Sequence, residues 1–297
     1  MVGTGKVSSI ISEENQRIIK LKRNISDRYL VAFDPLDGSS NIDYDGGMGT
    51  IFSVYNETGE YPSGKDIICA GYVLYSNSTV LVLSFSDKVY HFTLNRTNNC
   101  FFKNEGIIVI PSDSSKIFSA NVGNYNVWGE EDKNFYNYII NNKYKFRYSG
   151  CMVTDVHRIL FKGGIFIYPS DTKNINGKLR MLYECIPLSF IVENANGMSL
   201  NGITRIMDLM PRSIHQKCPI YIGCKRDVIL LKNFHKKIQV TNYSFIIENY
   251  SGSGEDEISV EQGEAVKEYR ILNDTSWSRV VMEGGDNGII PTKCLSI

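Results

Sequence analysis

Short apolar runs, separated by clusters of turn-forming residues, dominate the first third of the chain. Tyr29–Phe33 has the length and the branched or aromatic content of a buried strand, and Val7–Ile11 predicts a shorter one. Three further runs alternate apolar and polar positions at regular spacing, and they are Ala70–Tyr75, Thr79–Ser84 and Val89–Thr93. Because only turn clusters separate them, we expect an antiparallel sheet.

Strand-like and helix-like patterns alternate between residues 110 and 235. Ile117–Asn121 and Gly163–Pro169 predict buried strands, and apolar residues at helical spacing within Gly150–Phe161 predict a helix. Pro187 fits the first turn of a second helix, which we expect Gly197 to end. The pattern therefore predicts a mixed α/β fold.

The pattern changes again after residues 236–242. From residue 243 to residue 297 the apolar runs are short and strand-like, and the segment is acidic near its start. We expect this segment to form a separate small all-β domain.

Composition excludes several classes of function. The chain of 297 residues has 32 basic and 32 acidic residues, so no overall charge favours nucleic acid or an acidic membrane as a partner. Its seven cysteines are scattered and form no disulfide framework, which favours a reducing, cytoplasmic location. No charged leader and no apolar run of about 18 residues is present, so neither secretion nor membrane spanning is expected.

The richest candidate chemistry follows the strand Tyr29–Phe33. Asp34 and Asp37 are separated by a proline-stiffened turn, so both carboxylates can point into one space beyond the strand end. Mg²⁺ usually binds one or two carboxylates together with water and phosphate. The adjacent Gly38, Ser39 and Ser40 offer backbone N–H groups and hydroxyls that suit a phosphate. The alternative is an Asp-rich turn that only caps a strand.

A second pair of carboxylates follows the predicted strand Val7–Ile11. Glu13 and Glu14 come after Ser12, which repeats the arrangement of a strand followed by two acidic residues. Such a sequence is also typical of a helix N-terminus, where Ser caps the helix and acidic residues occupy its first turn. Beside the later aspartates, we favour metal ligands.

Several of these stretches resemble the fructose-1,6-bisphosphatases. Asp34–Asp43, followed by Gly49–Phe52, is similar to the signature of that family, and its core Asp-Pro-Leu-Asp-Gly-Ser is shared by the wider group of metal-dependent, lithium-sensitive sugar and inositol phosphatases. Further stretches that resemble the family are Tyr148–Met152, Asp155–Arg158, Gly163–Pro169 and Asn176–Pro187. The resemblance covers residues 7–235.

The resemblance implies a fold and an activity. The family fold is a layered α/β/α/β/α structure, here with a metal-binding sheet domain at residues 1–109 and a sugar-phosphate-binding α/β domain at residues 110–236. The implied reaction is hydrolysis of the 1-phosphate of fructose 1,6-bisphosphate, a step of gluconeogenesis, with two or more Mg²⁺ ions, or Mn²⁺ or Zn²⁺ in their place. The family also implies a homo-oligomer, a homotetramer in the simplest case.

The resemblance also assigns roles to individual residues. The implied metal ligands are Glu13, Asp34, the Leu36 carbonyl, Asp37 and Glu184. The implied catalytic residues are Glu14, which would orient or deprotonate water, together with Asp37 and Glu184. The implied substrate-binding residues are Gly38, Ser39 and Ser40 for the 1-phosphate, and Asn121, Arg147 (from a neighbouring subunit), Tyr148, Tyr168 and Lys178 for the rest of the sugar phosphate.

Residue chemistry alone leaves alternatives open. Lys178 also fits a solvated basic patch, and Tyr148 and Tyr168 also fit core aromatics. The family carries an AMP-binding region and a mobile acidic loop before the point that corresponds to Val7. We therefore expect a truncated chain without AMP inhibition and with reduced activity. The rival functions are a weakly active or inactive scaffold that recruits partners through its C-terminal segment, and a bisphosphatase that accepts sedoheptulose 1,7-bisphosphate.

Residues 243–297 resemble an SH3 domain in the order and spacing of their motifs. Such domains bind proline-rich peptides in an aromatic groove beside an acidic loop. The groove residues implied by the resemblance are Tyr250, Trp277 and Pro291, and those of the acidic loop are Glu255, Asp256 and Glu257. Glu248 and Cys294 stand where two groove tyrosines are expected. The alternative is an acidic surface loop on a small β-barrel.

Overall fold

The computed structural model describes residues 5–21, 29–57, 59, 61–112, 115–239, 244–254, 257–271, 276–282 and 286–295. It divides into two compact units, Met1–Lys232 and Asn233–Ile297. No helix in the described ranges is long and apolar enough to cross a membrane.

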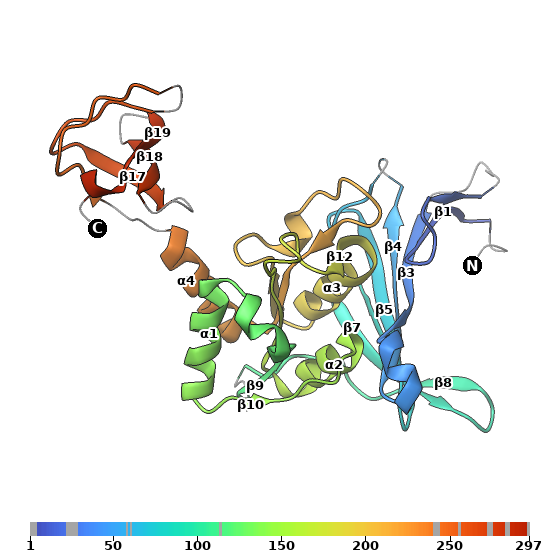
Figure 1. Cartoon of the computed structure of the whole chain (residues 1–297). Helices are drawn as coiled ribbons and strands as arrows, with labels where there is room; N and C mark the ends of the chain where they lie inside the picture. Colours follow the sequence, from blue (N-terminus) through green and yellow to red (C-terminus); the bar gives the residue numbers. More distant parts are fainter. Residues whose placement is uncertain are drawn as a thin grey trace. The chain divides into compact units, whose positions relative to one another are not determined.

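An eight-stranded sheet forms the first half of the larger unit (Figure 1). Its strand order is β2-β1-β3-β4-β5-β6-β7-β8, with β1 (Val7–Ser12) parallel to β3 (Tyr29–Asp37). The remaining strands are antiparallel to their neighbours, namely β2 (Ile19–Lys20), β4 (Met48–Asn56), β5 (Ile67–Tyr75), β6 (Thr79–Phe85), β7 (Lys88–Asn95) and β8 (Cys100–Lys103). The strands predicted in this region are confirmed.

A second sheet of five strands follows, in the order β10-β9-β11-β15-β13. These strands are β10 (Lys145–Phe146), β9 (Ile117–Ala120), β11 (Ile165–Tyr168), β15 (Ile220–Cys224) and β13 (Gly197–Leu200). β10, β9 and β11 run parallel to one another, so their carboxyl ends meet at one edge of the sheet. A short separate ladder pairs β12 (Leu179–Arg180) with β14 (Lys217–Cys218).

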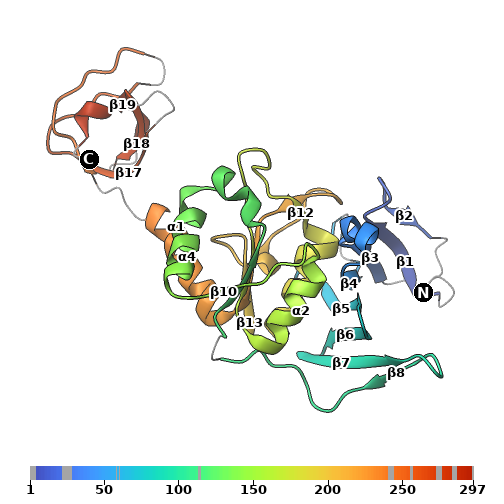
Figure 2. The same ribbon diagram turned by 60° about the horizontal axis from the view of Figure 1, so that its bottom comes forward.

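Helices cover both faces of the second sheet (Figure 2). α2 (Met152–Lys162) and α3 (Ile186–Asn194) lie between the two sheets, and contact both of them. On the other face lie α1 (Glu130–Asn141) and α4 (Lys225–Gln239). The Tyr221 hydroxyl of β15 donates to Asp132 of α1 at 2.7 Å, which fixes α1 to the sheet.

The expected α/β/α/β/α layering is met only in part. Along β4, Ile51 and Tyr55 face the helices and are fully buried, whereas Phe52 and Val54 on the opposite face are only half-buried. Among the described residues no helix packs on that outer face, so the layers present are β/α/β/α.

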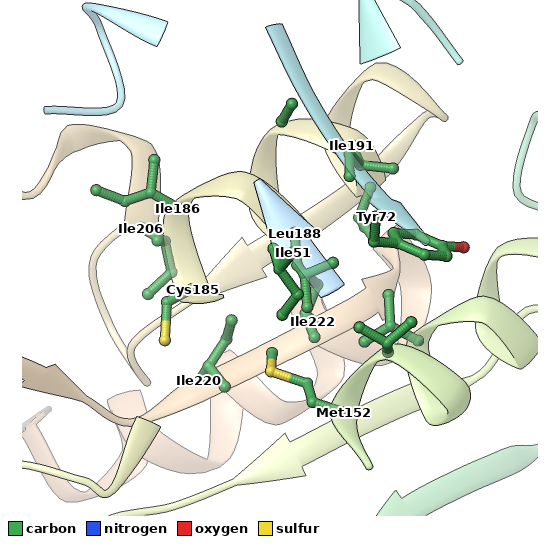
Figure 3. Packing of buried hydrophobic residues seen from close by; sticks show 14 of the residues in the cluster. Ile51, Tyr72, Met152, Cys185, Ile186, Leu188, Ile191, Ile206, Ile220 and Ile222 are labelled. Atoms are coloured by element: carbon green, nitrogen blue, oxygen red, sulfur yellow. The ribbon is translucent and has the colours of Figure 1, made fainter. Parts of the chain in front are cut away.

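One continuous hydrophobic core joins the two sheets through α3. Figure 3 shows Leu188 of α3 close to Ile51 of the first sheet and Ile222 of the second. Because α3 is packed between two sheets, six of its nine residues are buried and the other three are half-buried. Its burial explains why the apolar residues of this helix are not confined to one face.

The end of α3 differs from the prediction. The helix ends at Asn194, and Asn196 rather than Gly197 adopts the left-handed conformation, with φ of 67°. Gly197 instead begins β13, where a Cβ atom would lie 2.4 Å from Val192 Cγ1 and 2.6 Å from the Gly223 carbonyl oxygen. The glycine is therefore required by close packing, and not by a helix cap.

The smaller unit is an antiparallel sheet with a core of its own. Its strands, in spatial order, are β16 (Ser244–Phe245), β17 (Ala265–Ile271), β18 (Trp277–Met282) and β19 (Asn287–Pro291). Isolated bridges join Ile246 to Leu295 and Tyr250 to Val260. The predicted small all-β module is confirmed to this extent.

We expect Ile222→Ala to destabilise the larger unit by about 2–5 kcal/mol, because it leaves a cavity in a core that both sheets share. Ile175→Ala is the matched control, since this isoleucine is 77% exposed and should change the free energy of unfolding by less than about 0.5 kcal/mol. Urea unfolding in a Trp277→Phe background would follow the larger unit alone, because Trp128 is then the remaining tryptophan. Equal effects of the two alanine substitutions would contradict a core at Ile222.

Candidate functional site

Three buried carboxylates converge at the end of β3. One oxygen from each of Asp34, Asp37 and Glu184 lies within 4.8 Å of the others. These residues are only 2%, 8% and 7% exposed, so water screens their mutual repulsion weakly. Like charges this close require a cation or bound protons. The cluster is therefore a candidate metal centre.

A β-bulge brings Asp34 and Asp37 to the same side of the sheet. Residues three apart on a regular strand point to opposite faces, because side chains alternate. Here Asp34 pairs with Ile51 and Asp37 with Gly49, so three steps along β3 match two along β4. The extra residue restores a common direction for the two side chains. Pro35 lies in this bulge, where its missing N–H costs no ladder bond.

Asp37 is held by the start of α2. Its Oδ2 accepts the backbone N–H of Val153 at 2.7 Å and the thiol of Cys151 at 3.0 Å. Burial raises the pKa of Asp37, and these hydrogen bonds partly oppose that rise. The sequence analysis assigned no role to Cys151, so its contact with a candidate ligand was missed.

Asp34 interacts with Glu13 from the neighbouring strand. β1 and β3 run parallel with Ser12 beside Phe33, which places Glu13 next to Asp34 at the shared strand end. Asp34 accepts the Leu36 N–H at 2.9 Å. Burial, followed by the hydrogen bond and the charge of Glu13, raises the pKa of Asp34 to about 8. Asp34 therefore binds a proton more tightly than an exposed aspartate does in the absence of a cation.

The alternative reading of Ser12–Glu14 as a helix N-terminus is wrong. A turn, and not a helix, follows β1, and the Glu14 N–H donates to Ser12 Oγ at 3.4 Å. Glu13 and Glu14 are both exposed. The turn thus presents two carboxylates at the rim of the buried cluster.

Glu184 lies in a single π-helical turn, Met181–Cys185, directly before α3. Its Oε2 accepts the backbone N–H of Arg180 at 2.5 Å, and burial raises its pKa well above the ordinary value. The Tyr55 hydroxyl donates to the Leu182 carbonyl at 2.8 Å, which fixes the turn to β4. In a regular helix the N–H of residue 187 would donate to the carbonyl four residues earlier. Proline has no N–H, so Pro187 is the sequence signal for the wider turn.

The glycine and serines that follow Asp37 lie against α2. Gly38 has a φ of 79°, and a Cβ atom there would lie 2.7 Å from Cys151 Cβ, so only glycine fits. Ser39 and Ser40 begin a short 3₁₀ helix and are exposed. Asn41, which the sequence analysis did not single out, is 1% exposed and donates to the carbonyls of Gly47 and Ser149.

The predicted sugar-phosphate residues gather at one edge of the second sheet. Asn121 follows β9, Arg147 follows β10 and Tyr168 ends β11, and these three strands are parallel. Burial, followed by the proximity of Tyr168, raises the pKa of Tyr148, and Asp37 is among its electrostatic neighbours. The structure therefore brings these side chains to the same strand-end region, beside the metal centre.

Lys178 comes from a different segment, between β11 and β12. It is exposed and lies directly before β12, on the same segment as Glu184. Arg147 is also exposed, and its Nη1 donates only to the neighbouring Phe146 carbonyl among the bonds described, at 2.7 Å. Both residues are available to an anionic ligand.

In the smaller unit, Tyr250 and Trp277 lie with ring centroids 6.1 Å apart in an edge-to-face arrangement. The Tyr250 hydroxyl donates to Glu257 Oε2 at 2.6 Å, and Pro291 ends β19 opposite Trp277. Two residues of the predicted acidic loop, Glu255 and Asp256, lie outside the described residues.

Comparison with known proteins agrees with this geometry. Residues 1–105 match the family model described as fructose-1-6-bisphosphatase, N-terminal domain, and residues 110–236 match the C-terminal domain of the same family. The chain belongs to the class 1 fructose-1,6-bisphosphatase family. The metal centre draws Asp34 and Asp37 from the first matched region and Glu184 from the second.

The similarity extends over most of the chain. It is 41% identical over 251 residues to a class 1 fructose-1,6-bisphosphatase of Pelodictyon phaeoclathratiforme, covering 79% of this chain and 75% of that protein. A chloroplastic fructose-1,6-bisphosphatase of Triticum aestivum is 38% identical over 78% of this chain and 62% of its own length. The T-state crystal structure of the Leishmania major fructose-1,6-bisphosphatase superposes with a TM-score of 0.75 at 36% identity, covering 80% of this chain and 78% of that one.

We expect the metal-free protein to lose stability as the pH rises from about 4 to about 8. The pKa of Asp34 is raised to about 8 from the ordinary 3.8, so the folded state binds protons that the unfolded state releases in this range. Asp34→Asn should flatten this dependence, and should also reduce the stabilisation that Mg²⁺ gives the wild-type protein. Thermal unfolding at pH 5 to 8, with chelator or Mg²⁺, measures both effects. A wild-type curve in chelator as flat as that of Asp34→Asn would contradict the raised pKa.

Proposed function

We propose that this protein is a divalent-cation-dependent phosphatase that removes the 1-phosphate of fructose 1,6-bisphosphate, with Mg²⁺ as the working cation. The observation that carries the proposal is the buried triad Asp34, Asp37 and Glu184. Within the described part of the chain no lysine or arginine forms an ion pair with these carboxylates. Membership of the fructose-1,6-bisphosphatase family supports the reaction.

The donor set fits Mg²⁺. Hard oxygen ligands dominate it, and they would be Glu13, Asp34, the carbonyl of Leu36, Asp37 and Glu184. Two or more ions fit this number of carboxylates, and Mn²⁺ or Zn²⁺ could replace Mg²⁺. When bound, such ions activate water and stabilise the alkoxide that leaves.

The residues of this chain would divide the remaining work. Glu14, at the rim, would orient the attacking water or accept its proton. Gly38, Ser39 and Ser40 would hold the 1-phosphate through backbone N–H groups and hydroxyls. The rest of the sugar phosphate would contact residues at the strand ends of the second sheet, namely Asn121, Arg147, Tyr148, Tyr168 and Lys178.

The larger unit would work as two domains, with metal binding in residues 1–109 and sugar-phosphate binding in residues 110–236. The exposed guanidinium of Arg147 supports a homo-oligomer, a homotetramer in the simplest case, in which this arginine serves the site of a neighbouring subunit. All seven cysteines are free thiols, which supports a cytoplasmic location.

We expect Asp37→Asn to lower phosphate release from fructose 1,6-bisphosphate by at least about a hundredfold, because the change removes a charge from the metal centre. Asp45→Asn is the matched control: this aspartate is exposed, lies outside the carboxylate triad, and should leave the rate unchanged. Equal rates for wild type and Asp37→Asn would contradict the proposed site.

The same assay separates the rival readings. A higher kcat/KM on sedoheptulose 1,7-bisphosphate would change the assigned substrate and keep the metal chemistry. No release from either sugar by folded, Mg²⁺-loaded protein would favour a scaffold over an enzyme.

The smaller unit supports a second proposal, an SH3-like domain that binds proline-rich peptides. Tyr250 and Trp277 would stack against the prolines, with Pro291 beside them. Glu257 would pair with a basic residue of the peptide; hydrogen bonds from Ser253 and Tyr250 lower its pKa, so it is charged at neutral pH.

We expect a synthetic peptide with an arginine beside a P-x-x-P core to bind the full chain, and Trp277→Ala to weaken binding at least about tenfold. Ile247→Ala, which alters an exposed apolar residue of the same unit, is the control. Calorimetric titration measures both variants. Binding that survives Trp277→Ala would show that the peptide lies elsewhere.

A further inference from the structure

His215 connects two segments of the metal centre that are far apart in the sequence. Its Nδ1 lies 2.7 Å from the Tyr183 hydroxyl oxygen, and its Nε2 lies 3.0 Å from the carbonyl oxygen of Asn15. Tyr183 directly precedes Glu184, and Asn15 lies in the turn that carries Glu13. One imidazole therefore spans from the π-helical turn to the turn after β1.

The two contacts define which tautomer a neutral ring adopts. A carbonyl oxygen only accepts hydrogen bonds, so Nε2 of His215 must carry the proton that is donated to Asn15. In the neutral ring Nδ1 is then an acceptor, and the Tyr183 hydroxyl donates to it. Both nitrogens are thus satisfied by a neutral histidine.

The turn after β1 has weak attachments of its own. The Glu13 N–H donates to the Phe33 carbonyl at 3.3 Å, the Glu14 N–H donates to Ser12 Oγ at 3.4 Å, and the Asn15 N–H donates to the Ser12 carbonyl at 3.2 Å. All three bonds are at or beyond the long end of the ordinary range for an N–H donor. The shorter bond from His215 comes from outside the turn, so it restrains the position of the two exposed carboxylates.

The other end of the connection is rigid. Tyr183 is fully buried, and Arg180 Nη1 donates to the His215 carbonyl at 3.2 Å. The Met181 N–H donates to the Gln216 carbonyl at 2.7 Å, beside the β12–β14 ladder. His215 is therefore fixed to the segment that holds Glu184, and it transfers that rigidity to the turn after β1.

We propose that His215 is a positioning residue of the metal centre, which holds the turn bearing Glu13 and Glu14 against the buried carboxylates. The inference rests on the proposed function in one respect, that the carboxylates bind a divalent cation. Groups that orient metal ligands commonly alter metal affinity by about 10- to 100-fold when they are removed.

Two substitutions separate the two hydrogen bonds. In His215→Gln the side-chain amide can still donate to Asn15, because its nitrogen reaches the place of Nε2. In His215→Asn the shorter side chain can accept from Tyr183 at the place of Nδ1, but cannot reach Asn15. If the bond to the turn matters, glutamine should preserve metal affinity better than asparagine.

The control is another tyrosine–histidine pair of the same unit. The Tyr72 hydroxyl lies 2.8 Å from Nδ1 of His157, and Tyr72 is fully buried like Tyr183. Tyr72→Phe therefore removes an equivalent buried hydrogen bond that does not lead to the turn after β1. It reports how far a general loss of stability affects metal binding.

The experiment is a titration of the full chain with Mn²⁺ alone, in which the electron paramagnetic resonance of free Mn²⁺ gives the Kd. We expect His215→Asn to weaken binding at least about tenfold, and His215→Gln and Tyr72→Phe to stay within about threefold of the wild type. Thermal unfolding in chelator checks that all variants are folded.

Equal Kd values for wild type and His215→Asn would overturn the proposal, as would an equal loss in Tyr72→Phe. Phosphate release is measured separately. A wild-type protein that binds Mn²⁺ without hydrolysing the sugar phosphate would overturn the proposed reaction, while a weakened His215→Asn would still support positioning. A wild-type protein that binds no Mn²⁺ would overturn both.

Discussion

Repulsion among three buried carboxylates is the constraint on which the site depends. Each of them accepts a backbone N–H, from Leu36 to Asp34, from Val153 to Asp37 and from Arg180 to Glu184. These donors belong to three different segments, the bulge of β3, the first turn of α2 and strand β12. Three separate segments therefore each direct an N–H group at a carboxylate that would otherwise be destabilised by burial.

The sequence predicted the strands and helices better than it predicted how they pair and where their backbone departs from regular geometry. Tyr29–Phe33 and Val7–Ile11 were recognisable as strands because apolar runs of that length are typical of buried strands, and the acidic residues after them were evident. The parallel pairing of β1 with β3 brings Glu13 next to Asp34. This pairing is a tertiary property, and no local sequence pattern indicates it. Glu184 was found through a family resemblance and not through its spacing.

Two of the contacts that sequence reasoning missed are long-range. Cys151 bonds to Asp37 across 114 positions, and His215 bonds to Asn15 across 200. Nothing in either local pattern distinguishes a buried thiol or a half-buried imidazole with such a partner from one that only fills space. The misplaced end of α3 has a similar cause, because the packing of β13 on β15 decides where Gly197 is needed.

The smaller unit departs from the aromatic groove that its resemblance implies at two positions. Cys294 is 1% exposed and belongs to the core, and Glu248 forms an ion pair with Lys293 at 3.2 Å. This surface has fewer aromatic rings and more charge than the implied groove. Its affinity for a peptide would therefore depend more strongly on the salt concentration.

The origin of the ligands has a mechanical consequence. Asp34 and Asp37 belong to the first sheet, whereas Glu184 belongs to the helical layer that separates it from the second. A cation held by all three would link these layers, and its binding free energy would add to the free energy of unfolding of the larger unit. Removing the cation would then weaken the contact between the layers before either sheet unfolds. A chelator would therefore lower the stability of this contact selectively and reversibly.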